Sequence, residues 1–160
     1  MGKSVEDVRG RFALAVKEHL GDALINFSTA ILIWLFGVLV YLPLAFSIEP
    51  RNLPMICSLI ILTVFSIFMF RGIEAFKPIL NLAPAFLAQE YKKIRKSNWS
   101  IERLKDVFEC IMMVLVIVIV YALYYPLIAI INPSLNGIIL IPILIWIFLL
   151  ISKTITTKSE

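Results

Sequence analysis

The sequence predicts an all-α integral membrane protein whose four transmembrane helices form two tandem hairpins related as a parallel repeat. Three observations predict this class: 61% of the 160 residues are hydrophobic, only 16% are charged, and the apolar residues gather in four long stretches. A soluble domain has roughly 25% charged residues, whereas a membrane-spanning helix needs about 20 apolar residues in succession. We therefore expect one membrane domain.

Charged and turn residues set the limits of the four apolar stretches, because a charge is costly inside the hydrocarbon layer. The stretches cover residues 23–46, 53–70, 107–131 and 138–151. The last one is short for a crossing, so we expect its helix to extend back to Asn136 and forward to about Ile155.

The polar segments on either side of the first two stretches are expected to form amphipathic helices on the cytoplasmic side. Residues 5–20 carry apolar side chains at helical spacing with charges between them. The segment between the second and third stretches has an apolar half around Pro78 to Ala88 and then a basic half. Ser100 is expected to cap the third helix. The predicted layout is a first hairpin at about 23–72, a cytoplasmic linker at about 73–105 and a second hairpin at about 106–155.

Lysine and arginine are distributed very unevenly. Fourteen of the fifteen precede the first stretch, separate the second from the third, or follow the fourth, and Arg51 is the exception. Because positive residues stay on the cytoplasmic side during insertion, this pattern places both termini and the linker in the cytoplasm. We expect the membrane to be that of a prokaryotic cell.

A ten-residue pattern, Tyr-x-Pro-Leu-x-x-x-Ile-x-Pro, occurs at the end of the first stretch and again at the end of the third. Its matching residues are Tyr41, Pro43 and Pro50 in the first copy and Tyr124, Pro126 and Pro133 in the second. A duplicated hairpin that begins and ends inside would give two copies of the same orientation, related by a rotation of about 180° around the membrane normal. The tyrosines are expected to form an outer aromatic belt. The prolines are expected to bend the helices and close the turns, or alternatively to act as gating kinks.

Two groups of residues are candidate binding sites. The first is a basic cluster that would attract anionic lipid headgroups or another polyanion, or would act only as the topology signal: Lys92, Lys93, Arg95 and Lys96. The second is the pair Asn26 and Glu109, which could form a polar ring at the inner end of the helices.

The sequence gives no motif for catalysis. It contains a single histidine, His19, and no acid–base pair, nucleophile or metal motif, so we expect no enzyme, no cofactor and no metal site. In the middle of the second stretch, Thr63 and Ser66 are expected to bond to their own helix backbone, which leaves no polar site for a carrier.

The predicted function is that of a structural or accessory membrane protein, which packs against copies of itself or other subunits and presents a basic face to anionic lipid or a partner. A homo-oligomeric ion channel or small transporter is one alternative, gated by an apolar constriction. A lipid-associated virion coat protein is another, and only in that role would nucleic acid be a partner.

Overall fold

The computed structural model describes residues 2–95 and 99–156, and every element within these ranges is a helix. The elements are α1 (Gly2–Phe36), the π-helical turn η1 (Gly37–Tyr41), α2 (Leu42–Ile48), α3 (Leu53–Arg95), α4 (Ile101–Ile131) and α5 (Pro133–Thr156). Four helical stretches are long and apolar enough to cross a membrane, which confirms the predicted number. The fourth, α5, extends in both directions as expected.

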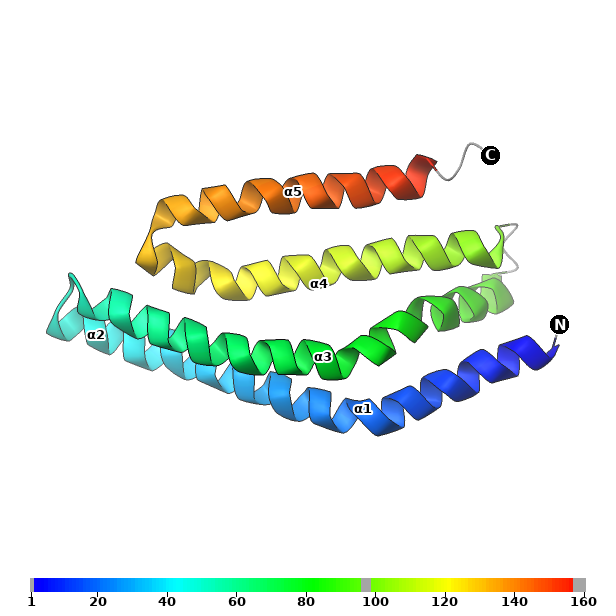
Figure 1. Ribbon diagram of the computed structural model, residues 1–160, viewed down its shortest axis with the longest axis horizontal. Coiled ribbons are helices and arrows are strands. Elements are labelled where there is room, and N and C mark those ends of the chain that lie inside the picture. Colours follow the sequence, from blue (N-terminus) through cyan, green and yellow to red (C-terminus); the bar gives the residue numbers. More distant parts are fainter. Residues whose placement is uncertain (1, 96–98, 157–160) are drawn as a thin grey trace.

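The helices follow one another across the molecule in chain order (Figure 1). The rod formed by α1, η1 and α2 lies along α3, α4 lies against α3, and α5 packs chiefly on α4. The two hairpin turns lie at one end of the bundle, and the start of α1, the end of α3 and the start of α4 lie at the other. Both hairpins therefore have the same orientation, as the predicted layout requires.

Helices α1 and α3 are longer than the apolar stretches they contain. The segment 5–20 continues into the first stretch within α1, and α3 runs without a break through Pro78 and Pro84 to Arg95. The amphipathic segments are therefore extensions of the long helices, and the prediction of separate helices is wrong. At 1.5 Å per residue, the 43 residues of α3 span about 64 Å, twice the thickness of a hydrocarbon core. Both helices bend where their extensions begin (Figure 1).

Close packing holds α1 against α3. A Cβ atom placed on Gly37 would lie 2.6 Å from Cγ2 of Ile61, and one placed on Gly72 would lie 2.9 Å from the ring of Phe27. Small residues that let two backbones approach in this way are typical of helix contacts in membranes. The hydrophobic core also joins α1 to α4. Its cluster of buried residues consists of Ala30, Leu42, Ile61, Phe65, Met69 and Leu127.

The helical extensions pack through aromatic rings. Phe12 of α1 stacks on Phe86 of α3 with ring centroids 4.6 Å apart, and Tyr91 of α3 meets Phe108 of α4 edge to face at 5.9 Å. The Ser100 hydroxyl accepts a bond of 3.2 Å from the backbone N–H three residues further on, which confirms it as the cap of α4. The extensions of α1 and α3 and the first turns of α4 therefore pack together at this end of the bundle.

The first copy of the ten-residue pattern contains a change of helix type. The N–H of Leu42 donates to the carbonyl of Gly37, five residues earlier, and this π-helical turn directly precedes Pro43. Such a turn accommodates the proline, which has no N–H and crowds the preceding turn of a regular α-helix. Tyr41 and Pro43 are exposed, and Pro50 lies in the turn between α2 and α3.

The second copy has a different backbone. Pro126 lies inside an α4 helix that is continuous through Ile131, and Pro133 is the first residue of α5, where a missing N–H costs nothing. Both copies end the first helix of a hairpin at the same end of the bundle. The duplication itself stays a prediction.

Candidate functional site

Hydrogen bonds from two other helices surround Pro126 in α4. The indole Nε1 of Trp34 in α1 donates to the carbonyl of Leu123 at 2.7 Å, and the Ser58 hydroxyl of α3 donates to the carbonyl of Leu127 at 2.7 Å. Proline removes one donor from the helix ladder and loosens the turn before it, while each carbonyl has two lone pairs to offer. The kinked part of α4 is therefore fixed to both α1 and α3.

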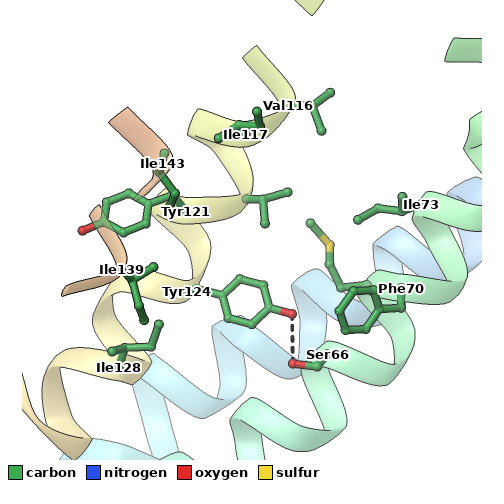
Figure 2. A pocket seen from close by; sticks show the side chains of 12 residues that line it. Ser66, Phe70, Ile73, Val116, Ile117, Tyr121, Tyr124, Ile128, Ile139 and Ile143 are labelled. Atoms are coloured by element: carbon green, nitrogen blue, oxygen red, sulfur yellow. Dashed lines mark hydrogen bonds between the residues drawn. The ribbon is translucent and has the colours of Figure 1, made fainter. Parts of the chain in front are cut away.

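A third bond involves Tyr124. Its hydroxyl donates to Oγ of Ser66 at 2.9 Å (Figure 2). Its ring meets Phe65 edge to face at a centroid distance of 5.0 Å. The prediction that Tyr124 holds its hydroxyl in water at an aromatic belt is therefore wrong, because the residue belongs to the helix–helix contact. Thr63 does bond to its own helix, donating to the carbonyl of Leu59 at 2.8 Å.

These bonds border a groove of about 430 Å³ between α3, α4 and α5. The groove exists because α3 and α5 both pack against α4 but do not pack closely against each other. Its walls are side chains from Ser66 to Ile73 of α3 and from Val116 to Ile128 of α4, together with Ile139 and Ile143 of α5 (Figure 2). Apart from the hydroxyls, which bond to protein atoms, the lining is aliphatic or aromatic.

The α4–α5 turn carries two asparagines. Oδ1 of Asn132 accepts a bond of 2.9 Å from the N–H of Ser134 and so caps α5. Asn136 is 7% exposed and donates a long bond of 3.4 Å to the carbonyl of Tyr125, while its Oδ1 atom has no partner among the described residues. The Tyr121 hydroxyl reaches the Asn136 carbonyl at 3.4 Å. The turn is thus held by polar contacts at the outer border of the groove.

The two residues of the predicted inner polar ring lie apart within one chain. The Asn26 amide donates to a carbonyl of its own helix, four residues earlier, at 2.8 Å, and Glu109 is exposed. Trp34 of α1 contacts Leu123 of α4, and Asn26 lies eight residues before Trp34, so Asn26 is level with about position 115 of α4. That position is about 9 Å along the helix from Glu109. A ring shared between several copies stays a prediction.

Three members of the basic cluster form the last turn of α3. Lys93 and Arg95 are exposed, Lys92 is half-buried, and Lys96 lies outside the described residues. At the nearby start of α4, the guanidinium of Arg103 lies 4.4 Å from the ring centre of Trp99. The cluster therefore lies at the end of the packed extension, beyond the apolar part of α3.

Sequence reasoning did not single out several residues that organise this site. Ala23 and Ala30 of α1 and Gly37 of η1 are all buried, and their seven-residue spacing, visible in the sequence, could have indicated a contact stripe. Trp34 and Ser58 give no such signal, because their partner carbonyls lie 89 and 69 positions away in the chain.

Within the described part of the chain, no three His, Cys, Asp or Glu residues are gathered in a way that could hold a metal ion. No protein-family model, curated protein or solved structure matches the sequence. What the protein does must therefore be argued from its own helices, groove and charged surfaces.

Proposed function

We propose that the chain is a non-enzymatic structural or accessory integral membrane protein, which packs with itself or with other subunits. One observation carries this proposal: in the apolar windows of α4 and α5, only 6% of the residues are buried within the chain. An apolar surface of that extent needs lipid or another protein to cover it. The polar groups between the helices support the same function, because Trp34, Ser58 and Tyr124 bond to protein atoms and leave no polar path for an ion.

The proposed topology places both termini and the α3–α4 connection in the cytoplasm. A cysteine replacing Ser134, which is exposed at the α4–α5 turn, is expected to react with an impermeant thiol reagent from outside. A cysteine replacing Ser152, which is exposed near the end of α5, is expected to react only after the membrane is opened. Cys57 and Cys110 are replaced in both variants, so that the native thiols do not contribute background labelling. Labelling in the opposite order would contradict the topology.

The basic end of α3 is proposed to meet anionic lipid headgroups. Each positive charge near such a surface contributes about 1 kcal/mol, so neutralising Lys92, Lys93, Arg95 and Lys96 is expected to weaken association markedly. Reconstitution into vesicles of graded phosphatidylglycerol content would measure this effect, together with its salt dependence. The matched control removes four exposed charges elsewhere at the same end: Arg9, Arg11, Lys77 and Lys105. The control variant is expected to lose much less of its association with anionic lipid.

The same vesicles test the structural role against the channel alternative. We expect no ion flux above that of protein-free vesicles. Reproducible single-channel currents that change in a Glu109→Gln variant would contradict the structural proposal. An equal loss of lipid association in the cluster variant and its control would contradict only the assignment of the basic cluster.

A further inference from the structure

We propose that the groove between α3, α4 and α5 is a binding site for one acyl chain of a phospholipid. The inference rests on the membrane location of the proposed function. It concerns the groove lined from Ser66 to Ile73 and from Val116 to Ile128, which the fold leaves open because α5 packs chiefly on α4.

The chemistry of the walls selects a hydrocarbon. Three hydroxyls line the groove and each has a protein partner, since Tyr124 donates to Ser66 at 2.9 Å and the Tyr121 hydroxyl lies 3.4 Å from the Asn136 carbonyl. A polar ligand would lose its bonds to water and find no unpaired partner here. A saturated chain loses nothing of that kind and gains contacts along three apolar walls.

The size of the groove favours an acyl chain over a helix as its occupant. From Val116 to Ile128 the groove follows α4 for about 18 Å. A helix about 10 Å wide would displace about 1,400 Å³ over that length, whereas all of the space between atoms in the groove, its open side included, amounts to about 940 Å³. A helix from a second copy could therefore enter only if α3 and α5 moved apart, whereas one hydrocarbon chain needs no such movement.

The position of the groove selects the leaflet. Ile128 lies about 5 Å and Val116 about 22 Å from the end of α4 at Ile131, measured along the helix. One leaflet contributes about 15 Å to the hydrocarbon core. With Ile131 at the edge of the hydrocarbon core, the part of the groove from Ile128 to Tyr121 lies in the leaflet on the side of the hairpin turns, and the Val116 end reaches past the middle of the core. That leaflet is the outer one in the proposed topology.

The test uses the full chain in vesicles that contain a phosphatidylcholine with a photoactivatable diazirine on one acyl chain. After illumination, mass spectrometry maps the labelled residues. Labelling is expected to concentrate on half-buried groove residues such as Val116 and Val120. Outward-facing Val118, which is 52% exposed on the same helix, is expected to react much less.

Variants that fill the groove sharpen the test. Val116→Phe on α4 and Ile143→Phe on α5 place a ring in the groove from opposite walls and are expected to lower groove labelling about tenfold. The matched control, Val118→Phe, adds the same ring on the outward face and is expected to leave groove labelling unchanged. Two filling variants are used so that loss of folding in one does not decide the result.

Four outcomes would overturn the proposal. Uniform labelling around α4, or groove labelling that survives both filling variants, would identify ordinary surface lipid only. Crosslinks from groove residues to a second copy of the chain, formed by a bifunctional reagent in a parallel sample, would identify a helix as the occupant. In each of these cases the proposed membrane function would stand. Absence of lipid labelling on every helix would overturn both the groove site and the membrane location.

Discussion

A Phe65→Ala variant is expected to lower the free energy of unfolding by about 3 kcal/mol. Phe65 has no exposed surface, belongs to the central core cluster and supports the ring of Tyr124. Its removal would leave a cavity where α3 meets α4, and the surrounding helices can relax only partly. We place the cost at the lower end of the range for buried aromatic residues, because in a membrane or micelle the unfolded helices remain in apolar surroundings.

Equilibrium unfolding in mixed micelles with increasing dodecyl sulfate would measure this effect. Phe148→Ala provides the control, since Phe148 on α5 is 72% exposed and its removal creates no internal cavity. Phe65→Leu should recover part of the loss because it keeps most of the volume. If Phe65→Ala and Phe148→Ala cost the same, the core described here would not be the part that holds α4 in place.

The four apolar helices could be predicted because the cost of charge in hydrocarbon is large and acts locally in the sequence. The same criterion failed at the ends of α1 and α3, since a helix does not stop where its hydrophobicity stops. Between Arg71 and Arg95 most residues are good helix formers, and Pro78 and Pro84 do not interrupt α3. Contacts such as that of Phe12 with Phe86 then hold the extensions together.

The candidate site could be predicted much less well. Tyr41 and Tyr124 occupy the same place in the repeated pattern, yet Tyr41 is 57% exposed and Tyr124 bonds to Ser66 inside the bundle. Pro43 follows a π-helical turn, whereas Pro126 lies among cross-helix bonds. These differences arise because this part of α4 bonds to side chains of α1 and α3. A rule based on the local sequence takes no account of such contacts between distant segments.

Glycine-to-alanine substitutions are expected to have opposite signs at different positions of the same helix pair. A Cβ atom at Gly37 or Gly72 would meet Ile61 or the ring of Phe27 at 3.0 Å or less, so α1 and α3 would have to separate or the side chains leave their favoured rotamers. Overpacking of this kind costs about 1–3 kcal/mol, against a gain in helix propensity of up to about 1 kcal/mol. A Cβ atom at Gly21 meets nothing within 4 Å.

The double variant Gly37→Ala with Gly72→Ala is therefore expected to lose about 3 kcal/mol of stability in the same micelle assay. The two contacts lie about 16 Å apart along α3, at Ile61 and Gly72, so their costs should nearly add. Gly21→Ala is expected to raise stability by up to about 1 kcal/mol, because it gains propensity without a clash. If all three substitutions stabilise the protein, α1 and α3 do not approach as closely as the glycines allow. If Gly21→Ala also destabilises, the effect belongs to the helix backbone and not to the α1–α3 contact.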